Sequence, residues 1–124
     1  MAQPKALVIT GYGTNCEQET AYAARRAGAS ADIVFFSDLT SGKARLTDYN
    51  LLLLPGGFLD GDDLGAAQAA ALRWRHSSTL EGHPLVEELS DFLQAGGLIL
   101  GICNGFQLMV KLGLLPCAGG ELFK

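Results

Sequence analysis

One cysteine in this chain lies in a sequence context that suits covalent chemistry. Cys103 is the centre of Gly101-Ile-Cys-Asn-Gly105, a G-x-C-x-G pattern between an apolar run and an amphipathic stretch. In a nucleophile elbow the turn from strand to helix is so tight that side chains two positions either side of the nucleophile would collide, so glycine is needed there. The turn would project the sulfur above the sheet, where the helix dipole and backbone N–H groups stabilise a thiolate. The pattern predicts that Cys103 attacks a carbonyl carbon.

Two backbone positions are expected to bind the oxyanion that forms in such an attack. The N–H of Asn104 would point at the oxyanion. The glycine pair in Leu54-Pro-Gly-Gly-Phe58 follows another apolar run and allows a second N–H to approach the reacting centre. Alternatively, Cys103 is a buried structural cysteine and the glycine pair is an ordinary tight turn. The strand–elbow–helix order favours the catalytic interpretation.

A cysteine nucleophile of this kind also needs a general base. The chain has 2 histidines, His76 and His83. Both are expected at solvent-exposed helix ends, within a segment (76–83) whose composition suits a flexible insertion. Neither is predicted to lie beside Cys103, so the sequence assigns no base.

The remaining motifs predict no additional site. Gly11-Tyr-Gly-Thr-Asn-Cys16 begins like a dinucleotide-binding fingerprint, but Cys16 replaces its third glycine. Asp60-Gly-Asp-Asp63 resembles a calcium loop only briefly, because Leu64 occupies the next ligand position, and helix capping explains it better. The 3 cysteines form no CxxC pair, which argues against a disulfide framework or a zinc site. No metal site is expected.

The elements that must position these residues alternate between strand and helix patterns. Apolar runs predict buried strands over 5–10, 32–36, 50–54 and 98–102. Amphipathic or alanine-rich stretches predict helices over about 16–27, 66–75, 84–95 and 104–112. Near-continuous apolar strands separated by helices indicate a parallel sheet covered on both faces. We expect an α/β fold, a flavodoxin-like three-layer sandwich, with its chemistry in the loops at the carboxyl ends of the strands.

Composition fits this fold and excludes several classes of function. A chain of 124 residues with 48% hydrophobic and 18% charged residues is typical of a compact globular protein, and its length leaves no room for a second domain of typical size. The net charge of −4, with no basic cluster, disfavours nucleic acid and anionic membranes as partners. Since we recognise no signal peptide or spanning segment and no paired cysteines, a cytoplasmic location is expected.

Three motifs resemble the class I (triad) glutamine amidotransferases. They are Gly11–Glu17, Leu54–Phe58 with Gly61-Asp62, and Gly101–Gln107 continuing through Gly113–Pro116. Within that family the motifs are most similar to the glutaminase component of phosphoribosylformylglycinamidine synthase, from purine biosynthesis. The resemblance covers nearly the whole chain and keeps the order of the motifs.

The resemblance implies a role for each matching residue. Cys103 would attack the carboxamide of glutamine, release ammonia and leave a glutamyl thioester that water hydrolyses. The implied oxyanion donors are Gly57 and Asn104, and the implied substrate contacts are Gly56, Phe58 and Gln107. Gln107 follows Cys103 by one helical turn and therefore lies on the same helix face.

The resemblance also implies partners that this chain does not contain. Ammonia would pass to a synthetase subunit, which uses ATP and magnesium to convert formylglycinamide ribonucleotide to its amidine, and a small accessory subunit would join the assembly. No cofactor is implied for this chain. The family's catalytic histidine and acidic residue follow the elbow in a segment with no counterpart here, so the chain is expected to be the N-terminal part of a longer glutaminase domain. Alone it is expected to turn over little glutamine and to expose apolar side chains at Leu114, Leu115 and Leu122.

Two other functions remain open on the same fold. A cysteine hydrolase or redox-responsive protein similar to the DJ-1/PfpI superfamily would commonly have histidine after the nucleophile, and Asn104 argues against it. A non-catalytic flavodoxin-like binding module would need a Ser/Thr-rich phosphate loop after the first strand, where this chain has only Thr10 and Thr14.

Overall fold

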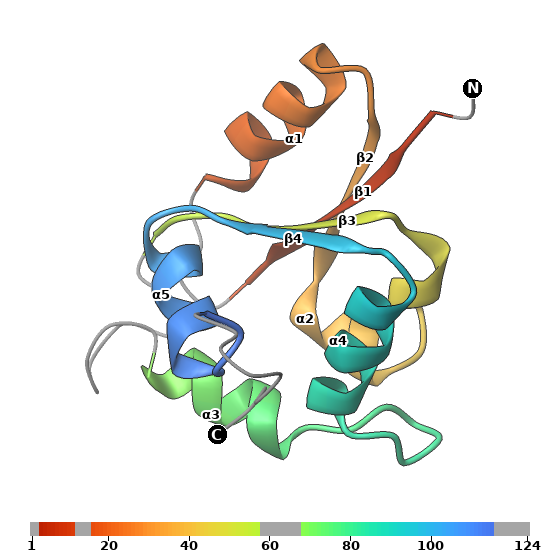
Figure 1. Cartoon of the computed structure of the whole chain (residues 1–124), viewed down its shortest axis with the longest axis vertical. Helices are drawn as coiled ribbons and strands as arrows, with labels where there is room; N and C mark the ends of the chain where they lie inside the picture. Colours follow the sequence, from red (N-terminus) through yellow and green to blue (C-terminus); the bar gives the residue numbers. More distant parts are fainter. Residues whose placement is uncertain (1–2, 12–15, 58–67, 116–124) are drawn as a thin grey trace.

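A parallel sheet with helices on both faces forms the centre of the molecule (Figure 1). The computed structural model describes residues 3–11, 16–57 and 68–115. The strands, in the spatial order β2-β1-β3-β4, are β1 (Lys5–Thr10), β2 (Ser30–Phe35), β3 (Leu51–Leu54) and β4 (Leu98–Gly101). The helices are α1 (Glu17–Arg26), α2 (Phe36–Thr40), α3 (Gln68–His76), α4 (Leu85–Gln94) and α5 (Asn104–Lys111), with a 3₁₀ turn, η1 (Leu46–Asp48), before β3. The predicted α/β three-layer arrangement is confirmed.

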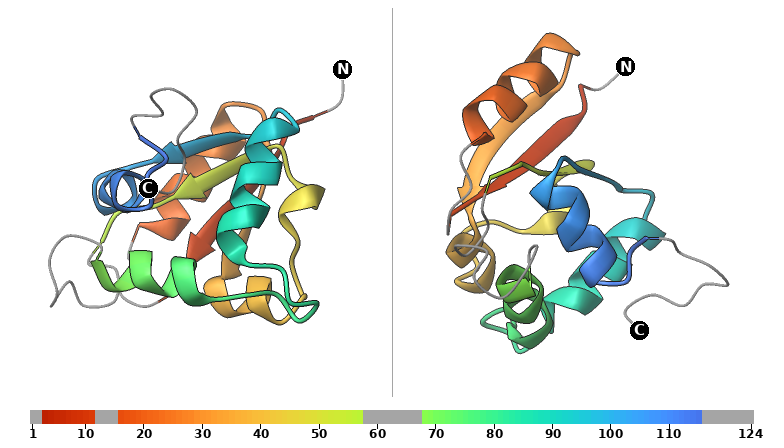
Figure 2. Two further views of the ribbon diagram at one scale, coloured as in Figure 1. Left: turned by 60° about the horizontal axis from the view of Figure 1, so that its bottom comes forward. Right: turned by 90° about the vertical axis from the view of Figure 1, so that its left-hand side faces the viewer.

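The helices divide unequally between the two faces of the sheet. Figure 2 shows α1 on one side of the sheet and α2, α3, α4 and α5 on the opposite side. The α1 face is packed with small and branched side chains, among them Ala6, Val8 and Ala21. Small residues let the helix approach the strands closely. The opposite face holds the larger cluster, in which Leu7 and Leu52 are completely buried.

Amphipathic patterning places α3 and α4 over that larger cluster. The sequence predicts a buried face formed by Leu85, Val86, Leu89, Phe92 and Leu93. Leu85, Leu89 and Phe92 are buried, and Val86 and Leu93 are partly buried beside them. Trp74 of α3 packs edge-on against Phe36, with ring centroids 5.1 Å apart. Burial of a leucine or phenylalanine side chain contributes roughly 1.5–3 kcal/mol, so this stripe fixes α4 against the sheet.

The strand register brings the functional loops to one edge. Leu54, the last residue of β3, pairs with Gly101, the last residue of β4. Because the two strands are parallel, the chain leaves both of them at the same level. The loops that follow β3 and β4 therefore begin side by side.

The region between β2 and β3 differs from the sequence expectation. Strand β2 ends at Phe35, and the chain turns at once into α2, where the Phe35 N–H donates a hydrogen bond to the Asp38 carboxylate at 3.1 Å. The short helix α2 and the turn η1 were not predicted. The segment expected to be an insertion forms a turn in which the Thr79 N–H donates to the His83 carbonyl at 2.9 Å.

The exposed apolar surface also differs from the expectation. Leu114 is buried, because the chain after α5 folds back and the Leu114 N–H donates to the Met109 carbonyl. Leu115 is exposed as expected, and Leu122 lies outside the described residues. Larger exposed fractions occur on β4, at Leu98 (67%) and Leu100 (52%).

Leu98 and Leu100 lie on the same face of the sheet that α1 covers at β1 and β2. Leu100 pairs with Leu53, a member of the α1-side cluster, whereas Ile99 packs on the opposite face. Helix α1 packs against β1 and β2, and none of the described helices covers its side of β4. None of the helices described has both the length and the apolar character needed to span a bilayer.

Candidate active site

The backbone at Cys103 is held in an unusual conformation. Its φ of 55° and ψ of −111° make it the one non-glycine residue with positive φ among those described. Such a conformation is costly for a residue with a Cβ, and it persists where the surroundings enforce it. Strand β4 ends two residues earlier and α5 begins at Asn104. The chain therefore makes the sharp strand-to-helix turn of an elbow, with Cys103 at its apex.

The two glycines that flank the cysteine allow this turn by their lack of a side chain. A Cβ on Gly101 would lie 2.6 Å from the Gly105 carbonyl oxygen, and a Cβ on Gly105 would overlap the Leu54 carbonyl oxygen. Real Cβ atoms do not approach backbone so closely. The elbow therefore depends on contact between the start of α5 and the end of β3.

The loop after β3 lies directly against the elbow. A Cβ at Gly56 would be 3.4 Å from the Cβ of Cys103, and the Ile102 N–H donates to the Leu54 carbonyl at 3.0 Å. Gly57 has a φ of 124°, a value that glycine adopts without the strain a side chain would add. The structure thus brings Gly56 beside Cys103, and Gly57 is the next residue in the chain. Phe58 lies outside the described residues, as do Gly61 and Asp62.

Two amide side chains follow the cysteine on α5. Gln107 is one turn further along, its N–H donating to the Cys103 carbonyl at 3.0 Å, and it is exposed. Asn104 is buried, with 4% of its surface exposed. Its Nδ2 donates to the Gln107 Oε1 at 2.7 Å. The sequence pattern predicts a role only for the backbone N–H of Asn104. Two amide side chains three residues apart on a helix are nevertheless close enough to form a hydrogen bond.

The thiols differ in accessibility. Cys103 is exposed at the apex of the turn, and Cys16 is half-buried just before α1. Cys117 lies outside the described residues, as do residues 12–15 and the acidic segment 60–63. An exposed sulfur above the strand ends is accessible to a small carbonyl substrate.

Neither histidine is joined to this site. His76 is the exposed last residue of α3, and His83 lies 3.6 Å from the Glu88 carboxylate. In the described part of the chain, no hydrogen bond connects either of them to Cys103. The expectation of exposed helix-end positions is confirmed for His76, and His83 is equally exposed just before α4.

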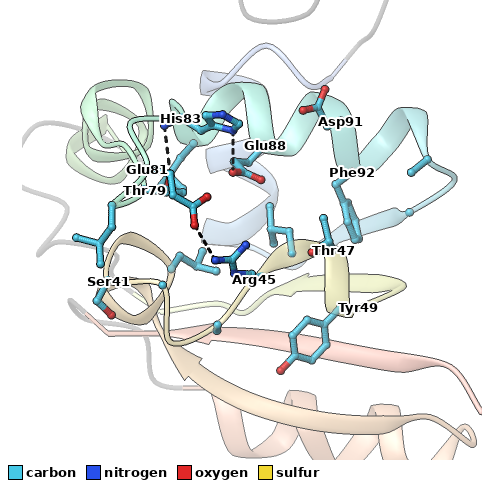
Figure 3. A pocket seen from close by; sticks show the side chains of 18 of the residues that line it. Ser41, Arg45, Thr47, Tyr49, Thr79, Glu81, His83, Glu88, Asp91 and Phe92 are labelled. Carbon is cyan, nitrogen blue, oxygen red and sulfur yellow. Dashed lines mark hydrogen bonds and ion pairs between the residues drawn. The ribbon is translucent and has the colours of Figure 1, made fainter.

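Away from the elbow, a hollow of about 760 Å³ lies between the 41–50 segment and α4 (Figure 3). The Arg45 guanidinium and the Glu81 carboxylate meet across it at 2.7 Å. Tyr49 on its wall donates to the Asp32 carboxylate at 2.8 Å. Burial, reinforced by that hydrogen bond, raises the pKa of Tyr49 to about 12. The described residues that line this hollow include His83 but none from the elbow.

The described residues hold no cluster for a metal ion. No group of three histidine, cysteine, aspartate or glutamate side chains lies close enough together within ranges 3–11, 16–57 and 68–115. The elbow itself offers an exposed thiol, the glycine loop and two amide side chains.

The chain is similar to glutamine amidotransferases. Residues 3–122 match the family described as the CobB/CobQ-like glutamine amidotransferase domain. Phosphoribosylformylglycinamidine synthase subunit PurQ of Methanococcus maripaludis is 49% identical over 111 residues, which are 90% of this chain and 38% of that protein. The PurQ subunit of Dehalococcoides mccartyi is 41% identical over 116 residues, covering 94% of this chain and 43% of that protein.

A solved structure agrees with the fold. The structure of PurLQS from Thermotoga maritima superposes with a TM-score of 0.71 at 32% identity, covering 92% of this chain and 46% of the matched chain. The chain spans about two fifths of the length of the curated relatives just described.

Proposed function

We propose that this chain is the N-terminal part of the glutaminase component of a phosphoribosylformylglycinamidine synthase. The chain belongs to the family of CobB/CobQ-like glutamine amidotransferase domains. The observation that carries the proposal is the strained elbow at Cys103, with the Gly56-Gly57 loop packed against it. Family membership favours this function over a DJ-1/PfpI-like hydrolase and over a non-catalytic binding module.

The elbow supports a covalent mechanism for glutamine hydrolysis. The Cys103 thiolate attacks the carboxamide carbon, and the carbonyl oxygen takes the negative charge of the tetrahedral intermediate. The N–H groups of Gly57 and Asn104 donate to that oxygen, which lowers the barrier because they are fixed before the reaction begins. The C–N bond then breaks, and the nitrogen takes up a proton and leaves as ammonia. Water hydrolyses the thioester to glutamate and restores the thiol.

Substrate contacts are proposed around the same thiol. Gln107 lies one helical turn from Cys103 and would form a hydrogen bond with a polar group of the substrate glutamine. Gly56 and Phe58 would line the site. The relatives support the wider assignment, since they are PurQ subunits and, in the solved structure, PurLQS. The proposed partners are the synthetase subunit, which would bind ATP and magnesium and use the ammonia, and the small accessory subunit. The whole assembly would work in the cytoplasm.

The proton transfer requires a base that the described residues do not offer near the elbow. A positioned base typically contributes 10²–10⁴-fold to the rate. Because the curated relatives are more than twice the length of this chain, we infer that the base lies in the part of a longer protein that this chain does not include. The 124 residues alone should therefore show little or no turnover.

Selective labelling tests the proposal. A chloroketone analogue of glutamine should alkylate Cys103 by displacement of chloride, and peptide mass spectrometry should find it there ahead of Cys16 and Cys117. Excess L-glutamine should protect Cys103 from the reagent. In the full-length protein assembled with its synthetase partner, Cys103→Ser should abolish ammonia release. Equal labelling of the three thiols, or robust turnover by residues 1–124 that His76→Ala removes, would contradict the proposal.

A further inference from the structure

The pairing of Asn104 with Gln107 fixes which atoms Gln107 can offer to a ligand. A glutamine amide has one oxygen acceptor and two N–H donors. The Oε1 of Gln107 accepts from the Asn104 Nδ2 at 2.7 Å. With that oxygen held toward Asn104, the Nε2 group faces away from it. The exposed end of Gln107, a residue one helical turn from Cys103, is then a donor.

Burial makes Asn104 a firm anchor for this arrangement. Its side chain is almost completely enclosed, whereas Gln107 is exposed and would otherwise sample many rotamers. A buried amide group gains little from water, so its burial favours the hydrogen bond that Asn104 donates to Gln107. Restricting a flexible side chain before a ligand arrives removes part of the entropy that binding would otherwise cost.

We propose that the Asn104 side chain is a positioning residue for substrate, in addition to the backbone role proposed above. It holds Gln107 with its N–H donors turned toward an acceptor oxygen of the substrate, either the carboxylate or the carboxamide oxygen of glutamine. This inference rests on the proposed glutaminase function. It assigns Asn104 a part in substrate binding, separate from the chemistry at the thiol.

Saturable labelling of the full-length protein by the chloroketone analogue of glutamine measures this effect. The half-saturating concentration reports binding, and the maximal rate reports alkylation of Cys103. Asn104→Ala should raise the half-saturating concentration roughly 3- to 10-fold, the effect of freeing one flexible side chain. The half-saturating concentration should change by a larger factor than the maximal rate or the rate with iodoacetamide, which makes no amide contacts. Asn50→Ala serves as a matched control, because Asn50 also makes an amide hydrogen bond, to the Lys5 N–H at the opposite end of the sheet.

A double-mutant cycle separates positioning from a merely structural role. In a Gln107→Ala background, Asn104→Ala should cause no further loss of binding, because the group that it positions is gone. A rise that persists in that background would overturn the inference. An unchanged half-saturating concentration in Asn104→Ala would also overturn it.

Gln107→Glu is a second variant, and because Gln107 is exposed we expect this substitution to leave folding unaffected. Its carboxylate can still accept from Asn104 but offers no donor outward, so the half-saturating concentration should rise at least as much as with Gln107→Ala. Parent-like binding by Gln107→Glu would refute the donor role. If the analogue fails to label the parent protein saturably at Cys103, the proposed function itself fails, and this outcome differs from saturable labelling that is insensitive to Asn104.

Discussion

The close contact between Gly105 and the end of β3 predicts a large effect for Gly105→Ala. The new Cβ would overlap the Leu54 carbonyl oxygen and lie 2.7 Å from its carbonyl carbon, so α5 and β3 must separate. Overpacking of this kind costs about 1–3 kcal/mol, and loss of the hydrogen bond from Ile102 to Leu54 adds about 1 kcal/mol. We expect a loss of about 2–4 kcal/mol, a substantial share of the roughly 5–15 kcal/mol of a typical domain.

Two measurements on the same variant check this expectation. Urea unfolding can be followed through the fluorescence of Trp74, the 1 tryptophan of the chain, which is buried in the core. The iodoacetamide rate at Cys103 reports whether the elbow keeps its shape. Gly28→Ala is the control, since its φ of 105° adds strain but a Cβ there meets open space. If Gly105→Ala is no less stable than Gly28→Ala and labels like the parent, the elbow does not depend on this contact.

The remaining predictions concern the core, the open sheet face and a tyrosine. Leu89→Ala, at a position with 1% exposure, should lower the free energy of unfolding by about 2–5 kcal/mol in urea. Because Leu98 and Leu100 are exposed, we expect the 124-residue chain to self-associate, and Leu98→Lys with Leu100→Lys should reduce this association in analytical ultracentrifugation. Association that the two substitutions leave unchanged would show that another surface is responsible. Because the folded-state pKa of Tyr49 is raised from 10.0 to about 12, its contribution to stability is present below pH 10 and lost as the pH rises toward 12. Tyr49→Phe should lack this loss, so the stability difference between parent and variant should shrink over that range. A constant difference would contradict the raised pKa of Tyr49.

The sheet and its main helices could be predicted because their patterns are long enough to read. The apolar runs before Gly11 and Pro55 identify β1 and β3 as strands buried on both faces. The apolar residues of α4 repeat at helical spacing over several turns, which distinguishes a helix from a strand. The elbow at Cys103 was predictable for a different reason. Gly101 and Gly105 stand where a side chain would clash with the backbone, and this requirement depends on backbone geometry alone.

Other features depend on contacts that a linear pattern does not contain. Helix α2 has only 5 residues, too few for a helical repeat, and it begins where Asp38 accepts a hydrogen bond from Phe35. Leu114 was expected to be exposed, but the turn after α5 folds it inward. The Asn104–Gln107 bond requires the burial of one amide beside an exposed one, and burial is set by the whole fold.

The all-parallel pairing has a consequence for how the molecule assembles. Each strand pairs with a partner distant in the chain, as Ala6 with Leu51 and Leu51 with Leu98, and no hairpin is formed between the named strands of the described segments. Closing such long loops costs entropy before any contact is gained, which slows folding compared with local pairing. The shortest closure joins β1 to β2 through α1, so we expect that unit to form first and β4 to attach late. Until β4 attaches, the edge of β3 remains unpaired, and slower synthesis at low temperature should improve the yield of folded protein.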